Sequence, residues 1–131
     1  MKRYITTQEI GRYGERLAAR YLLFHGHRII KKNFRAGKYE IDLITATPRD
    51  LVFTEVKTRV YDSLEAAEAA APPKHAVDAD KQSFTRSAAL AYLRAYPSKK
   101  RPRMDVIEVL LLKREGKRPK KYAIRHIKAA Y

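Results

Sequence analysis

Two acidic residues and a lysine form the arrangement in this sequence with the clearest chemical meaning. Asp42 is followed, after twelve intervening residues, by Glu55-Val56-Lys57. On a β-strand, Glu55 and Lys57 project from the same face because one residue separates them. Carboxylates on adjacent strands suit Mg²⁺ or Mn²⁺, hard cations that keep several waters, one of which could attack a phosphodiester. The spacing therefore indicates metal-dependent hydrolysis, with Lys57 orienting the water and offsetting charge in the transition state.

The same residues also have a purely structural interpretation. Glu-x-Lys recurs at Glu115-Gly116-Lys117, in a basic loop, so the triplet carries little information in a chain this charged. Only the first copy follows buried-type residues and has an upstream strand aspartate. An exposed cross-strand salt bridge among Asp42, Glu55 and Lys57 would be an ordinary arrangement of modest stability. Spacing alone leaves both interpretations open.

A long helix is predicted near the start of the chain, and it carries a third acid of interest, Glu15. Thr6-Thr7-Gln8-Glu9 has capping-box spacing, and the apolar residues that follow recur at helical intervals to about residue 24. At about 100° per residue, Glu15 falls at the edge of that apolar stripe. A fully solvated helix glutamate would not usually lie there.

Three β-prone segments follow, at about residues 27–34, 39–46 and 51–59, separated by short polar turns that predict an antiparallel meander. Glu40 shares a strand face with Asp42. It could join a metal site or serve as a structural hydrogen-bond partner just outside it. Leu51 and Phe53 share a face with Glu55 and Lys57, so this face leaves the core and enters polar surroundings.

The rest of the chain completes one domain, residues 1–131. Residues 60–79 are rich in Ala and acids, contain Pro72-Pro73 and lack periodicity, which predicts a mobile loop. A second helix is expected to about Tyr96, then a strand over 104–112, a basic loop over 113–121 and a last strand over 122–127. There is no internal repeat.

A set of short segments runs in one order from Gly11 to Val109. They are Gly11-Arg12-Tyr13-Gly14-Glu15, Tyr21-Leu22, Asn33-Phe34-Arg35, Glu40-Ile41-Asp42-Leu43-Ile44, Val52-Phe53-Thr54-Glu55-Val56-Lys57-Thr58-Arg59, Lys81-Gln82 and Arg103-Met104-Asp105-Val106-Ile107. Together they resemble the YraN family of bacterial proteins. That family looks like part of the restriction-endonuclease-like, or PD-(D/E)xK, nuclease superfamily and is similar to archaeal Holliday-junction resolvases.

The resemblance implies an α+β (α/β) fold with an α-β-β-β-α-β core, a mixed central sheet flanked by helices and, in this chain, an extra C-terminal strand. It also implies roles for individual residues. Asp42, Glu55 and Glu15 would be metal ligands, Lys57 the catalytic lysine, and Glu40 and Gln82 would lie just outside the ligands. Lys38-Tyr39 stands where the family usually has a glycine before Glu-Ile-Asp, so the turn there is reshaped.

The charge of the chain points to a polyanionic partner. Its 29 Lys and Arg exceed its 14 Asp and Glu, which gives a formal charge of +15. Positive charge attracts a phosphate backbone without reading bases, and no zinc finger or clear helix-turn-helix is visible. Shape recognition of DNA is therefore expected. The basic residues proposed to track phosphates are Arg59, Lys74, Lys81, Arg86, Lys99, Lys100, Arg101 and Arg103.

Other function classes have little support. The chain has no cysteine, which excludes thiolate chemistry and fits a reducing cytoplasm. No membrane span and no glycine-rich nucleotide-cofactor motif are expected. His25 and His27 flank Gly26, and His75 and His126 lie apart from them, so the histidines are expected at turns or on the surface and not at a metal.

The sequence thus predicts a Mg²⁺-dependent (or Mn²⁺-dependent) endonuclease acting on DNA, with branched or Holliday-junction DNA as a favoured class. For a symmetric junction, a homodimer would be the economical design. Two rivals stay open: a nucleic-acid-binding module on a nuclease-like fold that does not turn over, and an assembly factor whose charge only aids solubility.

Overall fold

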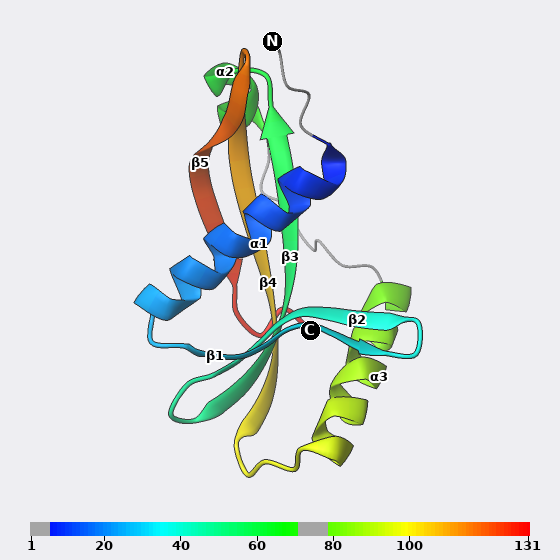
Figure 1. The fold of residues 1–131 in the computed structure, drawn as a ribbon. Coiled ribbons are helices and arrows are strands. Elements are labelled where there is room, and N and C mark those ends of the chain that lie inside the picture. Colours follow the sequence, from blue (N-terminus) through cyan, green and yellow to red (C-terminus); the bar gives the residue numbers. More distant parts are fainter. Residues whose placement is uncertain (1–5, 71–78) are drawn as a thin grey trace.

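One five-stranded sheet organises the chain, with strand order β1-β2-β3-β4-β5 (Figure 1). The computed structural model describes residues 6–70 and 79–131. Its elements, in chain order, are α1 (Thr7–Phe24), β1 (Arg28–Ala36), β2 (Tyr39–Ala46), β3 (Asp50–Tyr61), α2 (Leu64–Ala69), α3 (Ala79–Ala95), β4 (Arg101–Arg114) and β5 (Lys117–Ile127).

Helix α1 has the bounds that its capping and periodicity predict. The Thr6 hydroxyl accepts a hydrogen bond from the Glu9 amide at 3.1 Å, which satisfies one of the unpaired donors of the first turn. The helix ends at His25, and Gly26 follows with φ of 84°, a conformation that favours glycine. Its buried face consists of small residues and one leucine: Gly14, Ala18, Ala19 and Leu22.

The sheet is mixed. β1, β2 and β3 form the predicted antiparallel meander, whereas β4 lies parallel to β3 along twelve residue pairs, from Asp50 and Arg101 to Tyr61 and Leu112. Parallel neighbours need a crossover connection, and α3 lies within it. β5 then returns antiparallel to β4. This α-β-β-β-α-β order with an added strand is a restriction-endonuclease-like core.

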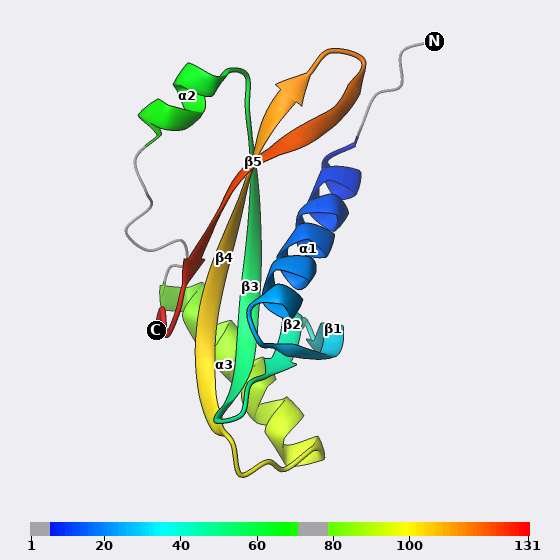
Figure 2. The ribbon, with the colours of Figure 1, turned by 90° about the vertical axis from the view of Figure 1, so that its left-hand side faces the viewer.

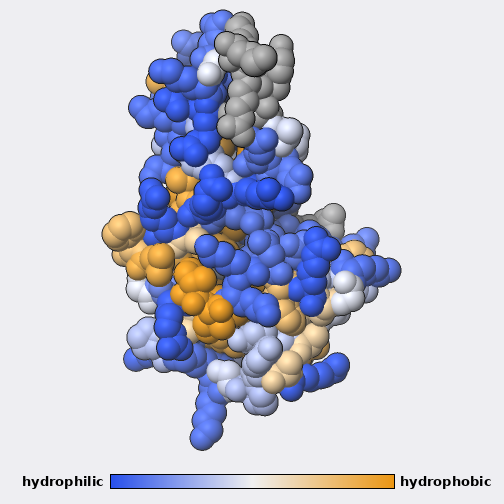
Figure 3. All heavy atoms as spheres, viewed as in Figure 1, coloured by the Kyte–Doolittle hydropathy of each residue, from blue (hydrophilic) through white to orange (hydrophobic). Residues whose placement is uncertain are grey.

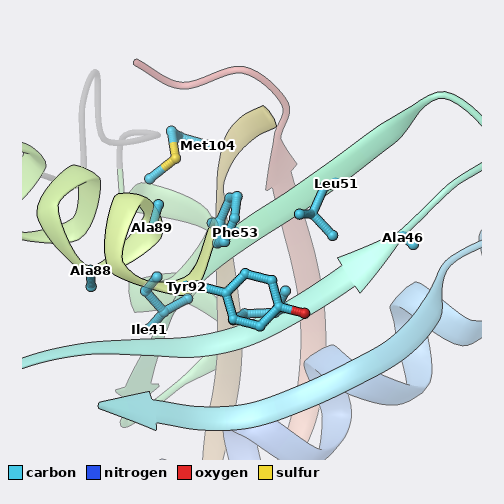
Figure 4. Packing of buried hydrophobic residues seen from close by; sticks show 9 residues of the cluster. Ile41, Ala46, Leu51, Phe53, Ala88, Ala89, Tyr92 and Met104 are labelled. Atoms are coloured by element: carbon cyan, nitrogen blue, oxygen red, sulfur yellow. The ribbon is translucent and has the colours of Figure 1, made fainter. Parts of the chain in front are cut away.

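Two apolar clusters lie on opposite faces of the sheet, under α3 and under α1 (Figures 1 and 2). On the α3 face, Phe53 and Tyr92 meet edge to face with ring centroids 5.9 Å apart, and Ile41 and Met104 complete the packing (Figure 4). On the α1 face, Leu22 packs among aliphatic residues of β2 and β4. Both helices are therefore fixed relative to β3.

Two segments differ from the sequence prediction. Within the loop expected over 60–79, residues 60 and 61 belong to β3 and Leu64–Ala69 forms α2, a helix that Ser63 caps and that buries Ala67. Residues 71–78 lie outside the described part. The basic loop expected over 113–121 is instead a tight hairpin, in which Arg114 pairs with Lys117 and Gly116 has φ of 66°. A glycine-containing turn between two charged strand ends explains the difference.

A buried network of charged and polar side chains also corrects the expectation for two histidines. His27 and His126 are buried, not exposed at turns. His126 Nε2 lies 2.7 Å from Asp105 Oδ2, and Arg103 makes two 2.9 Å bonds to the same carboxylate. Burial acts to raise the pKa of Asp105, but the hydrogen bonds from His126, Arg103 and the Ala129 amide together lower it to about 2. Arg103 and Asp105 thus form a buried ion pair.

Candidate active site

Strands β2 and β3 separate at Asp42 and Glu55, the two acids that the sequence motif singles out. Their ladder runs from Ala46 and Leu51 to Leu43 and Thr54 and then stops. The next residues, Asp42 and Glu55, face a fork, since β3 continues along β4 while the β1–β2 hairpin turns across it (Figure 1). At this point Asp42 Oδ2 accepts a 2.7 Å hydrogen bond from the Val56 amide. A side-chain carboxylate thus replaces the ladder carbonyl that the amide has lost.

Glu55 and Lys57 extend the face of β3 that faces α3. Alternation along β3 puts them on the side of Leu51 and Phe53, two residues of the α3-face cluster. Glu55 Oε1 lies 3.4 Å from Lys81 Nζ of α3, whereas its Oε2 is buried and has no hydrogen-bond partner. Within the described ranges, the side chain of Lys57 makes no hydrogen bond or ion pair with another residue. The site thus contains a buried acceptor and an available ammonium group.

Helix α1 brings Glu15 to the fork. Directly before it, Gly14 lies so close to β3 that a Cβ there would overlap the side chain of Thr58. When the Asn33 amide is oriented to satisfy its neighbours, its nitrogen donates to Glu15 Oε2 at 3.3 Å and to Glu40 Oε1 at 3.1 Å. Asn33 has φ of 52°, a left-handed conformation that asparagine tolerates better than most residues. This backbone turn places the amide between two acids.

The acids at the fork affect one another's protonation. Burial raises the pKa of Asp42 to about 7, assisted by the charges of Glu15, Glu55 and Glu40 and opposed by the Val56 hydrogen bond. Burial also raises the pKa of Glu15, opposed by its hydrogen bond with Asn33. Asp42, Glu15, Glu40 and Glu55 therefore form a local concentration of negative charge in a protein whose net charge is +15. Such like-charge crowding is typical of sites that bind a cation or transfer protons.

The candidate ligands are carboxylate oxygens, the type of donor that a hard divalent cation prefers. Among the described residues, no group of three or more His, Cys, Asp and Glu side chains is arranged to hold a metal ion. Mg²⁺, however, usually binds through one or two carboxylates and keeps its remaining waters. Asp42 and Glu55 supply oxygen donors on neighbouring strands, and Glu55 Oε2 is an acceptor without a partner. A cation there would satisfy this buried oxygen.

The structure places the predicted phosphate-binding residues in three groups. Lys81 Nζ lies 3.4 Å from Glu55 and so beside the fork, whereas Arg59 lies further along β3, with its Nε 3.4 Å from Glu108 of β4. Arg101 and Arg103 bind Asp50 at the far end of β3, and Lys100 donates to the carbonyls of Thr47 and Pro48. The Arg86 guanidinium of α3 lies 5.3 Å from the ring centre of Tyr131, and Lys99 is exposed. Lys74 lies outside the described residues. Gln82, predicted to lie just outside the metal ligands, follows Lys81 on α3.

Sequence reasoning gave no role to two residues of this region. Asn33 lies within a quoted motif, but only its left-handed backbone shows that it links Glu15 and Glu40. Glu108 is 1% exposed, stands opposite Lys57 in the β3–β4 register and has one oxygen without a partner. The sequence does contain a signal for Glu108, since this acid interrupts a run of aliphatic residues in β4. Charged residues are almost never fully buried unless paired, so an acid at such a position is a candidate for a special role.

Replacing Asn33 by alanine is expected to raise the pKa of Glu15 further and to destabilise the fold by about 1–2 kcal/mol. The change removes a hydrogen bond that stabilises the Glu15 carboxylate and puts a less tolerant residue at positive φ. Carbon-detected NMR titration of the Glu15 carboxyl would measure the first effect and urea unfolding the second. In Asn33→Gly, the Glu15 pKa should rise as in Asn33→Ala but with less loss of stability. An unchanged Glu15 pKa in both variants would contradict the bridge.

Comparison with known proteins shows the family of the chain. The family model described as "Uncharacterised protein family UPF0102" matches residues 14–109, which include every element of the fork. The chain belongs to the UPF0102 family. This is the YraN family that the sequence motifs resemble.

Several UPF0102 proteins match over most of their length. One from Chlorobium phaeobacteroides is 36% identical over 124 residues, 94% of each chain. One from Chlorobaculum tepidum is 38% identical over 128 residues, 95% of this chain and 92% of the relative. One from Caldanaerobacter subterraneus is 37% identical over 108 residues, 82% and 84% of the two chains. In the described part of this UPF0102 chain, no helix has the length and apolar character to cross a bilayer.

Proposed function

We propose that this UPF0102 protein is a Mg²⁺-dependent endonuclease of the cytoplasm that hydrolyses phosphodiester bonds in DNA, with branched DNA such as a Holliday junction as its favoured substrate. One observation carries the proposal. Asp42 lies where β2 leaves β3, close enough to Glu15 of α1 and to Glu55 of β3 that burial, together with the charges of both acids, raises its pKa to about 7. Keeping these charges together is costly unless a cation is bound, and Lys57 follows Glu55 by two residues on the same face of β3.

The chemistry follows from the residue types. Asp42 and Glu55 would hold the ion, with Glu15 as a further ligand and the Val56 carbonyl as a possible donor. When bound, Mg²⁺ supplies Lewis-acid activation of water and neutralises phosphate charge. Lys57 orients the attacking water and stabilises the negative charge that develops on the phosphate. Attack at phosphorus with departure of the 3′ oxygen leaves a 5′-phosphate and a 3′-hydroxyl.

A second candidate function is a nucleic-acid-binding module on a nuclease-like fold that does not cleave. The observation that favours it is that, within 6–70 and 79–131, no three acidic or histidine side chains are arranged around a metal position. In this case the acids at the fork would be structural, and DNA binding would depend on salt without any effect of Mg²⁺ on the DNA. Both functions require DNA binding, and they differ only in whether the bound DNA is cleaved.

We expect the protein to cleave a labelled four-way junction faster than a flap or a linear duplex in Mg²⁺ or Mn²⁺. Glu55→Gln and Lys57→Met are each expected to lower the rate at least about 100-fold, because one loses a ligand and the other the transition-state charge. Gel electrophoresis of end-labelled DNA would measure the rates. Glu68→Gln, an exposed acid of α2, is the matched control and should cleave like the wild type.

Two outcomes would decide against hydrolysis by this site. Cleavage that persists in both Glu55→Gln and Lys57→Met would indicate a contaminating nuclease. Salt-sensitive binding without metal-dependent cleavage of any DNA or RNA substrate would establish the binding module instead. A homodimer, which would present two sites to the two strands of a symmetric junction, stays a prediction.

A further inference from the structure

A basic groove lies between the first turns of α1 and the β4–β5 hairpin, apart from the basic residues considered so far. Its volume is about 770 Å³. Five cationic side chains line it, Arg12 and Arg16 from α1 and Arg114, Lys117 and Arg118 from the hairpin, together with one carboxylate, Glu9. We call it the α1–hairpin groove. Figure 2 shows the hairpin leaning over the N-terminal end of α1.

An aromatic ring and the hairpin backbone hold the guanidinium groups of the groove in place. Arg118 lies 4.0 Å from the ring centre of Tyr13, and Arg16 lies 5.8 Å from it. Arg114 Nε donates to the carbonyl of Arg118 at 2.9 Å, across the tight turn at Gly116. Stacking and backbone bonding reduce the conformational freedom of these long side chains before any ligand arrives.

The lining of the groove carries an excess of positive charge, with five cationic side chains and one carboxylate. Among the described residues, no ion pair with a carboxylate is found for Arg16, Arg114, Lys117 or Arg118. The upper part of the molecule in Figure 3, over the hairpin and the start of α1, is strongly hydrophilic. Guanidinium forks match the geometry of phosphate oxygens and bind them through paired hydrogen bonds. An anion with several phosphates is the ligand that these groups fit.

The groove lies one helical turn from the candidate active site. Arg12 lines the groove, and Glu15 follows it by three residues on α1, so the two side chains are neighbours on the surface of the helix. A bound strand that leaves the fork past Glu15 would therefore meet the groove next. A concave site of this kind encloses a strand, whereas an anionic bilayer presents a flat surface to convex basic patches. These features favour nucleic acid over membrane.

We propose that the α1–hairpin groove binds the phosphate backbone of the nucleic-acid substrate beside the cleavage site. The inference rests on the proposed function in naming this nucleic acid as the substrate, but binding is measured without cleavage. The groove supplies phosphate contacts from residues that the sequence prediction did not include. It also places the β4–β5 hairpin, an addition to the α-β-β-β-α-β core, on the substrate.

The test compares two double variants that lose the same charge. Arg114→Gln/Arg118→Gln removes two groove cations, and Lys120→Gln/Lys121→Gln removes two exposed lysines of β5 that do not line the groove. Fluorescence anisotropy with a fluorescein-labelled four-way junction and a duplex, in EDTA at 50–200 mM KCl, gives affinity and its salt dependence. The groove variant should bind at least about tenfold more weakly, with a log K against log salt slope shallower by about 1.8. The lysine control should change that slope by less than about 0.5.

A single substitution tests whether any loss of binding in the double variant is caused by misfolding. Arg16→Gln, on an exposed position of α1, should weaken binding in the same direction with a slope change of about 0.9 while keeping the wild-type melting temperature. Equal weakening in the groove and lysine double variants, or unchanged binding in Arg16→Gln and the groove variant, would overturn the inference. So would binding to phosphatidylserine vesicles with none to DNA.

Cleavage assays in Mg²⁺ separate this inference from the proposed function. If wild-type protein binds DNA through the groove but cleaves nothing, hydrolysis fails and the groove stands. If wild-type protein cleaves and the groove variants bind and cleave equally well, the groove inference fails alone.

Discussion

Replacing Asp42 by asparagine is expected to make the protein more stable at pH 8 while lowering metal-dependent cleavage at least about 100-fold. The two effects have one cause. Burial and the charges of Glu15, Glu55 and Glu40 disfavour the ionised Asp42 side chain. The ionised form is the one that would bind the metal in the proposed mechanism. An asparagine keeps an acceptor for the Val56 amide, removes the buried charge and cannot replace the ligand.

The pH dependence follows from the direction of the shift. The pKa of Asp42 rises from 3.8 to about 7 on folding, so the folded state binds more protons than the unfolded state between these values. Wild-type stability should therefore fall as pH rises from about 4 to about 7 and stay lower above it. The advantage of Asp42→Asn should be absent near pH 4 and reach about 1–4 kcal/mol at pH 8.

Urea unfolding in EDTA across this pH range would measure the difference. Asp105→Asn is the matched control, because Asp105 is also buried but its pKa is lowered to about 2 by His126, Arg103 and the Ala129 amide. Its replacement should destabilise the protein at pH 8. Added Mg²⁺ should stabilise the wild type and not Asp42→Asn, since only the wild type retains the ligand. An Asp42→Asn protein less stable than the wild type at pH 8 would refute the repulsion argument.

Gly14→Ala is expected to destabilise the fold by about 2–3 kcal/mol and to weaken cleavage. The added Cβ overlaps Thr58 Oγ1 and lies 2.9 Å from Thr58 Cβ, so helix and strand must move apart. The displaced residue directly precedes Glu15, and the shift moves this acid away from Asp42. Thermal unfolding by circular dichroism would measure the stability and the junction assay the activity.

Two comparisons separate a local overlap from a general effect of alanine in the helix. Gly11→Ala, one turn earlier on α1, meets nothing within 4 Å and should stabilise the helix by up to about 1 kcal/mol. Thr58→Ala removes the nearest overlapping atom and should recover part of the loss when combined with Gly14→Ala. If Gly11→Ala and Gly14→Ala change stability equally, close contact between α1 and β3 is not the cause.

The sequence predicted the elements better than the contacts between them. Local signals, such as the Thr6 cap and the alternation around Phe53, suffice for α1 and for the faces of β3. The hairpin at Gly116 was assigned to a loop because its flanking residues are charged, and polarity outweighed strand propensity there. His126 was expected at the surface because nothing local to it shows that Asp105, 21 residues earlier, lies on the neighbouring strand.

For the candidate site, too, the sequence predicted the residues better than their arrangement in space. Residue types and the interval from Asp42 to Glu55 singled out Asp42, Glu55 and Lys57 without deciding between a site and a salt bridge, and the family resemblance added Glu15. What could not be predicted is how β2 leaves β3, because this depends on the left-handed turn at Asn33 and on packing against two helices. The α1–hairpin groove was missed for a related reason: Arg12 and Arg118 are distant in sequence and meet only across Tyr13 and the hairpin.

The bond that anchors Asp42 has a consequence for how the family can diverge. Its donor is the backbone amide of residue 56, so the anchor does not depend on which side chain stands there. Only proline, which lacks the N–H, would remove it. Position 56 can therefore vary in size and shape while the carboxylate keeps its place. Relatives that share 36–39% of their residues with this chain can retain the geometry of the fork, because part of it is built from atoms common to nearly every amino acid.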